Sequence, residues 1–135
     1  MNETTQKTIK KVPVILVVED DVFIKEILIS RLKKDGFDIL NAADGASGLQ
    51  LIESSSPDLV LLDLLLPAMD GFELLERMNQ SGLIKRVPVI VISNLSGEEN
   101  IRRAKNLGVK EYIIKAQSTT TQISEQLKNY LKKDI

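Results

Sequence analysis

The sequence contains no cysteine, no histidine and no tryptophan among its 135 residues. Without cysteine there can be no disulfide, no thiol nucleophile and no zinc–thiolate site. Without histidine the chain lacks the commonest general base and metal ligand, so a Ser-His-Asp triad is excluded. Any chemistry must therefore come from carboxylates, hydroxyls, amines or a metal held by oxygen atoms.

The sequence also lacks a strong net charge and a long apolar run. Its 18 Lys and Arg residues nearly balance 19 Asp and Glu residues, which argues against binding nucleic acid or anionic membranes by bulk charge. No apolar run approaches the ~18 residues of a membrane helix, and the polar N-terminus has no signal-peptide core. We therefore expect a cytoplasmic protein that does not bind membranes.

A length of 135 residues predicts one domain, since domains average about 150 residues. Residues 1–11 are polar and aperiodic, and we interpret them as a flexible N-terminal arm. Residues 12–133 are expected to form the domain. Short apolar runs alternate there with stretches of helical periodicity.

Five short apolar runs predict β-strands. They lie at Val12–Val18, Phe37–Leu40, Leu59–Leu62, Val87–Ile92 and Tyr112–Ile114. The runs do not alternate with polar residues, a pattern typical of strands buried on both faces of a parallel sheet.

A helical stripe follows each predicted strand. Gly36 is expected to end the first helix, Ser96 and Glu99 to form a capping box for the fourth, and Ser118 or Thr119 to open the fifth. The alternation predicts an α/β fold: a five-stranded parallel sheet of order 2-1-3-4-5, doubly wound and flavodoxin-like, with five helices.

Polar residues gather where the predicted strands end. The first strand ends in Glu19, Asp20 and Asp21, the third in Asp63, the fourth in Ser93 and the fifth in Lys115. In this strand order Glu19, Asp20 and Asp63 converge on one edge of the sheet. Clustered carboxylates repel, so a cation is expected, and oxygen ligands favour Mg²⁺ over Zn²⁺. Asp21 is equally well explained as a helix cap.

A metal, a hydroxyl and an ammonium at one edge together suit a phosphoryl group, for which an Asp carboxylate can be the covalent acceptor. Four segments of the sequence then carry a resemblance: Val14–Asp21, Pro57–Gly71, Val87–Ser93 and Tyr112–Lys115. With them, residues 12–131 resemble the receiver domain of two-component response regulators, in particular single-domain, chemotaxis-regulator-like members.

The resemblance implies a phosphorelay signal-transduction switch. Asp63 would accept a phosphoryl group from a phosphohistidine of a sensor histidine kinase or a histidine phosphotransfer protein. Mg²⁺ would be held by Glu19, Asp20, Asp63 and the backbone carbonyl of Leu65. Such a phosphoprotein catalyses its own phosphorylation and slow dephosphorylation, and is not a turnover enzyme.

The resemblance also assigns the remaining site residues. Ser93 and Lys115 would contact the phosphoryl oxygens of the aspartyl phosphate on Asp63. Tyr112 would be the aromatic residue whose rotamer follows the movement of Ser93. The fourth helix, the fifth strand and the fifth helix would then present a changed surface to a downstream protein.

Four residues near the site bear on how fast such a switch would run. Ala116 stands where the family usually has proline, so a trans peptide bond or a shifted loop is expected there. Asn94 replaces a small residue and is expected either to narrow access to Asp63 or to hydrogen-bond the phosphoryl group. The bulk of Leu65 and Leu95 predicts slow dephosphorylation, because apolar cover does not position water.

Other functions remain as alternatives or are excluded. A receiver-like interaction module that no longer turns over phosphate stays open. A haloacid-dehalogenase-type phosphatase conflicts with Leu65, which stands where that family needs a second Asp. A flavin carrier conflicts with the shortage of aromatic residues. A P-loop nucleotide enzyme is excluded, because the sequence has no P-loop motif. We expect no DNA-binding domain after the fifth helix, and a homodimer is left open.

Overall fold

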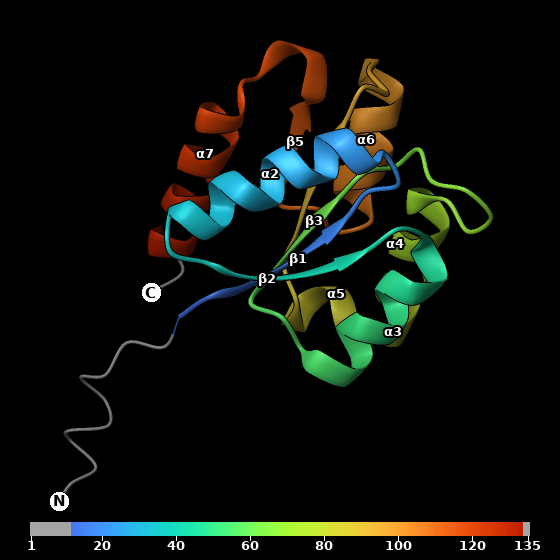
Figure 1. Ribbon diagram of the computed structural model, residues 1–135. Coiled ribbons are helices and arrows are strands. Elements are labelled where there is room, and N and C mark those ends of the chain that lie inside the picture. The colour runs from blue at the N-terminus through green and yellow to red at the C-terminus, as the bar shows by residue number, and fades with distance from the viewer. Residues whose placement is uncertain (1–11, 134–135) are drawn as a thin grey trace, which may run out of the picture.

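The computed structural model describes residues 12–133, so the expected arm at residues 1–11 lies outside the described residues. Strands and helices alternate along the chain (Figure 1). The strands are β1 (Val14–Val18), β2 (Asp38–Ala42), β3 (Leu59–Leu62), β4 (Val89–Ser93) and β5 (Glu111–Ile114). The helices are α2 (Val22–Lys34), α3 (Gly45–Ser55), α4 (Gly71–Ser81), α5 (Leu83–Arg86), α6 (Glu98–Asn106), the 3₁₀-helix η1 (Lys115–Gln117) and α7 (Thr120–Lys133).

The five strands form one parallel sheet in the order β2-β1-β3-β4-β5, which confirms the predicted topology. Successive side chains of a strand point to opposite faces. Leu16 and Val18 of β1 accordingly pack in a core with α3, α4, α5 and α6. Ile15 and Val17 pack in a second core with α2 and α7. Helices therefore cover both faces of the sheet, as Figure 1 shows.

The five predicted helices are present as α2, α3, α4, α6 and α7, and the described residues add the one-turn helix α5 directly after α4. Gly82, at a φ of 80°, separates α4 from α5. Leu83 and Ile84 of α5 are buried in the first core. A stretch of four residues is too short to show helical periodicity, so only packing onto the sheet identifies it.

Strand boundaries differ from the prediction by one or two residues. The first strand begins at Val14 rather than Val12, and the fourth at Val89 rather than Val87. Each begins directly after a proline, which has no N–H to donate to a neighbouring strand. The edge strand β2 runs from Asp38 to Ala42, two residues past its predicted end.

Aspartate side chains begin three of the helices. Asp21, Asp44 and Asp70 accept hydrogen bonds from N–H groups in the first turns of α2, α3 and α4, at 3.1, 2.7 and 2.9 Å. Such caps satisfy N–H groups that have no acceptor within the helix. Asp21 therefore acts as a cap, one of the two interpretations that its position in the sequence allowed.

The capping box predicted for the fourth helix is wrong. Helix α6 begins after Gly97, at a φ of 106°, with no side-chain cap, and Ser96 instead accepts a hydrogen bond through its carbonyl from Asn100. A reciprocal box occurs instead at the start of α7. There Thr119 and Gln122 exchange hydrogen bonds of 2.9 and 3.1 Å, in agreement with a helix opened by Thr119.

Candidate functional site

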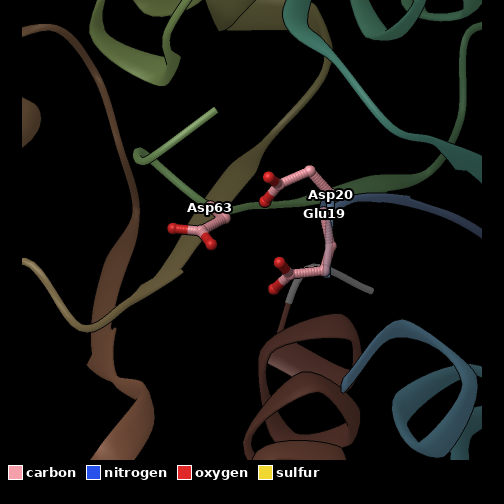
Figure 2. A group of neighbouring side chains, drawn as sticks. All are labelled: Glu19, Asp20 and Asp63. Atoms are coloured by element: carbon pink, nitrogen blue, oxygen red, sulfur yellow. The ribbon is translucent and has the colours of Figure 1, made fainter. Parts of the chain in front are cut away.

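Three carboxylates meet at the carboxyl edge of the sheet, where the chain leaves β1 and β3. Glu19 and Asp20 follow β1, and Asp63 follows β3, whose last residue pairs with Val18. One oxygen atom from each of the three carboxylates lies within 4.8 Å of the others. In Figure 2 the Glu19 and Asp20 side chains extend toward the side on which Asp63 lies. The two strands thus bring Glu19 and Asp20 to Asp63, which lies 43 or more positions later in the sequence.

Lys115 joins this cluster from the end of β5. Its Nζ donates hydrogen bonds to Glu19 Oε1 at 2.6 Å and to Asp63 Oδ2 at 2.9 Å. Both acceptors are buried, with residue exposures of 1% for Glu19 and 4% for Asp63. The ammonium therefore compensates part of the negative charge that the fold removes from water.

Burial and charge act together on the titration of this cluster. Burial raises the pKa of Glu19, although hydrogen bonds from Lys115 and from the Asp21 N–H oppose the rise, and the charge of Asp63 adds to it. Burial disfavours the Lys115 ammonium, but its hydrogen bonds to Glu19 and Asp63 outweigh that effect and raise the pKa of Lys115. Lys115 is therefore held as a cation between the two carboxylates.

The donor set fits a hard divalent cation. Three carboxylates face one ammonium, so the cluster carries an excess of acidic groups that a divalent ion can balance. All three groups offer oxygen atoms, which are the ligands that Mg²⁺ prefers. Asp20 is exposed, so an ion that enters from solvent can reach the cluster on that side.

The loop after Asp63 is held against the start of α4. Asp63 Oδ1 accepts a hydrogen bond from the Leu65 N–H at 3.1 Å, and the Leu64 carbonyl accepts one from the Gly71 N–H at 2.9 Å. A Cβ atom at position 71 would lie 2.5 Å from the Leu64 Cα atom, so glycine is needed for this close approach. The backbone carbonyl predicted as a ligand belongs to Leu65, in this loop, and its role stays a prediction.

Ser93 and Tyr112 both bond to the backbone of Leu95. Ser93 is fully buried at the end of β4, and its Oγ accepts a hydrogen bond from the Leu95 N–H at 3.2 Å. Tyr112, on the adjacent strand β5, donates from its hydroxyl to the Leu95 carbonyl. Burial and the charge of Asp63 raise the pKa of Tyr112, which stays a neutral donor. The two predicted switch residues therefore hold one loop.

Sequence reasoning missed one contact beside the site. The side-chain oxygen of Asn94 accepts a hydrogen bond from the Ala116 N–H at 2.8 Å. Every peptide bond of the described residues is trans, one of the two outcomes expected at Ala116. The signal that could have revealed the contact is that both residues depart from the family pattern.

Among the described residues no helix has the length and apolar character to cross a membrane.

Comparison with known proteins then gives one consistent result. The family model of the response regulator receiver domain matches residues 15–128. The chemotaxis protein CheY of Treponema pallidum is 36% identical over 104 residues, which cover 75% of this chain and 71% of that protein.

Longer proteins match over the same region. The probable transcriptional regulator ycf27 of Porphyridium aerugineum is 35% identical over 101 residues, 75% of this chain and 41% of that protein. The chain spans about two fifths of the length of this and the next three curated relatives. Among solved structures, a CheY-like response regulator receiver domain protein from Methanospirillum hungatei superposes with a TM-score of 0.83 at 30% identity. That match covers 91% of this chain and 96% of the other.

Proposed function

The chain belongs to the response regulator receiver domain family of two-component systems, and from this premise we propose that it is a phosphorylatable switch whose acceptor is Asp63. Receiver domains act as signalling switches rather than turnover enzymes. The observation that carries the proposal is the cluster of Glu19, Asp20 and Asp63 with Lys115 bonded across it. In this proposal residues 12–133 form the receiver domain, and the reaction takes place in the cytoplasm.

The proposed reaction is transfer of a phosphoryl group from a phosphohistidine to Asp63. A carboxylate oxygen of Asp63 forms a bond to phosphorus while the bond from phosphorus to the imidazole nitrogen breaks, and the electron pair leaves with the imidazole. Lys115, already 2.9 Å from Asp63, neutralises charge on the phosphoryl oxygens, and Ser93 donates its hydroxyl to one of them. Mg²⁺, held by Glu19, Asp20, Asp63 and the Leu65 carbonyl, would supply further charge neutralisation.

The same proposal explains the exposed apolar side chains at this edge. Val22 and Phe23 begin α2 directly after its cap Asp21, and they are 59% and 79% exposed. Ile27, one turn further along α2, is 56% exposed, and Leu65, in the loop after Asp63, is 53% exposed. A groove reaching Lys115 runs beside α2 between Ile24, Leu28 and Ile123. Exposed apolar groups that gather at one place favour a protein contact. We assign this surface to the histidine kinase or histidine phosphotransfer protein that carries the phosphohistidine.

Output is assigned to the surface formed by α6, β5 and α7. Ser93 and Tyr112 hold Leu95 from two strands, so a move of Ser93 toward a phosphoryl group on Asp63 frees the bond to the Leu95 N–H. The loop that precedes α6 then repacks. The downstream partner or a second copy of the chain binds the changed surface. The bonds to Leu95 support this assignment because they connect the site to α6.

The test is the intact mass of the protein after incubation with the small phosphodonor phosphoramidate. Wild type in Mg²⁺ should gain one phosphoryl group, while wild type without Mg²⁺ and the Asp63→Asn variant should gain none. Asp58→Asn is the matched control, because Asp58 lies at the opposite end of β3, bonded to the Val14 N–H, and this variant should label like wild type.

If the Asp63→Asn variant also gains a phosphoryl group, Asp63 is not the acceptor. A wild-type protein that stays unlabelled under conditions that label a known receiver would favour the alternative function. That alternative is a receiver-like interaction module that no longer turns over phosphate, with Asn94 and Ala116 as its departures from the family pattern.

A further inference from the structure

The hydrogen bond from the Ala116 N–H to Asn94 Oδ1, 2.8 Å long, connects the ends of two neighbouring strands. Asn94 directly follows Ser93, the last residue of β4. Ala116 directly follows Lys115, the first residue of η1. The contact therefore joins the backbone of the Lys115 segment to the residue beside the buried serine of the site.

This bond compensates for a weakness at the start of η1. The first N–H groups of a helix have no acceptor within it, and Ile114, which precedes η1, provides no side-chain cap. Asn94 supplies the missing acceptor from another strand. Proline at position 116 would have no N–H to donate, so the two departures from the family pattern form one donor–acceptor pair.

The geometry of Lys115 depends on this segment. The Lys115 ammonium makes hydrogen bonds of 2.6 and 2.9 Å. Because its side chain is long and flexible, a fixed backbone restricts the positions that the ammonium can take. On one side the backbone is fixed by the pairing of Ile114 with Ser93 in the sheet. On the other side the Ala116 N–H is tied to Asn94.

We propose that Asn94 is a positioning residue for Lys115, acting through the Ala116 N–H to keep the ammonium between Glu19 and Asp63. The part of the test that uses phosphorylation rests on the proposed function. A role in narrowing access to Asp63 predicts the opposite result: removal of the Asn94 side chain would then speed phosphorylation. With Asn94 as a positioning residue, the same removal slows it.

The first experiment needs no phosphorylation. Amide hydrogen exchange of Ala116 is measured by NMR in wild type, Asn94→Ala and Asn94→Asp, together with ¹³C relaxation of the Lys115 Cε atom. Asn94→Ala should exchange the Ala116 proton about tenfold faster, because Ala116 is exposed and relies on the bond for protection. It should also increase the mobility of Lys115, and Asn94→Asp, which keeps an acceptor oxygen, should match wild type in exchange. Unchanged Lys115 mobility in Asn94→Ala would overturn the proposal.

The second experiment is a double-mutant cycle with Lys115 on the rate of phosphorylation by phosphoramidate. Asn94→Ala should lower the rate about fivefold, the equivalent of one hydrogen bond. In a Lys115→Met background the same substitution should have no further effect on the rate, because Asn94 is proposed to act only through Lys115. An equal fivefold loss in that background, or a faster reaction in Asn94→Ala, would overturn the proposal.

The two experiments separate the inference from the proposed function. If the wild-type protein takes up no phosphoryl group, the proposed function fails. The amide exchange of Ala116 and the mobility of Lys115 then still decide whether Asn94 positions the lysine. If phosphorylation occurs but neither measurement changes in Asn94→Ala, the positioning role fails while the proposed function stands.

Discussion

At the scale of single residues, the site depends on burial of charges that the fold then pairs. Glu19 and Asp63 are almost completely buried, and each accepts a hydrogen bond from Lys115. Removing Lys115 would leave both buried carboxylates without their hydrogen-bonded cation, which costs more than an exposed ion pair contributes. One residue beside this charged centre is in contrast apolar and exposed. Leu65, whose N–H bonds to Asp63, exposes 53% of its surface beside the acceptor.

We expect the aspartyl phosphate to be long-lived because Leu65 neither positions nor admits a water molecule. Leu65→Asn should shorten its half-life about tenfold, since an amide beside Asp63 can orient the attacking water. The measurement is loss of the phosphoryl group by intact mass over time after removal of the donor. Leu65→Ala is the matched control, because it removes the bulk without adding a polar group. A Leu65→Asn variant that loses phosphate no faster than wild type would contradict the hypothesis.

At the scale of elements, a polar cluster fastens α2 to α7. Asp35, the C-cap of α2, accepts hydrogen bonds from Arg31 Nε at 2.8 Å and from the Ser124 hydroxyl of α7. Arg31 also donates to the Thr121 hydroxyl at 2.9 Å, and Lys128 Nζ lies 3.6 Å from Asp35. This cluster lies beside the apolar contacts of Leu28 and Leu32 with Ile123 and Leu127. Helix α7 is therefore held by α2 as well as by the sheet.

The Asp35 cluster predicts a specific pH dependence of stability. The hydrogen bonds from Ser124 and then Arg31 lower the pKa of Asp35 from its ordinary value of 3.8 to about 2. Because the folded-state pKa is the lower one, the stabilisation is complete above about pH 4 and is lost as the pH falls through 2. Asp35→Asn should lower the urea midpoint of unfolding at pH 7. Between pH 4 and 2 the midpoint of this variant should fall less steeply than that of wild type.

The control for that measurement is Glu53→Gln, which neutralises an exposed carboxylate on α3, away from the α2–α7 contact. This variant should keep both the urea midpoint and its pH dependence close to those of wild type. If Asp35→Asn and wild type decline in parallel between pH 4 and 2, the Asp35 cluster does not stabilise the fold in the way we describe.

At the scale of the whole molecule, chemistry and exposed apolar surface lie at the same edge of the sheet. Among the described residues, the exposed Val22 and Phe23 begin α2 after the end of β1, and the exposed Leu65 lies in the loop after β3. The exposed Val12 precedes β1, at the opposite end of that strand. A phosphodonor carried by a protein must approach the same edge as Asp63. The arrangement therefore predicts that a substitution can weaken binding of the donor protein without changing the rate of phosphoryl transfer to Asp63 from a small donor.

Phe23→Ala should slow transfer from a phosphorylated histidine protein about tenfold, because truncation of a central aromatic contact typically costs more than 1 kcal/mol. The rate with phosphoramidate should stay at the wild-type value, since Phe23 lies outside the acidic cluster. Val12→Ala, which truncates an apolar residue that is 47% exposed at the other edge, is the matched control and should change neither rate. Equal slowing with both donors would show that Phe23 acts on the chemistry and not on docking.

The sequence by itself determined the α/β class, the parallel sheet and the set of polar residues that follow its strands. Apolar runs without alternation can be buried only between two layers of helices, and the carboxyl ends of parallel strands share one edge. Local patterns failed where a single turn or one cap was involved, as at α5 and at Ser96. Those outcomes depend on packing against residues distant in the sequence.

Only the tertiary structure decided how the site is held together. Lys115 reaches Glu19 across 96 positions, and Asn94 meets Ala116 across 22. Contacts of this kind have no local periodicity, because they arise where separate strands end side by side. Residue types at strand ends therefore indicate which groups can take part, and the three-dimensional fold determines which of them bond, since a hydrogen bond depends on distances of about 3 Å that no spacing in the chain encodes.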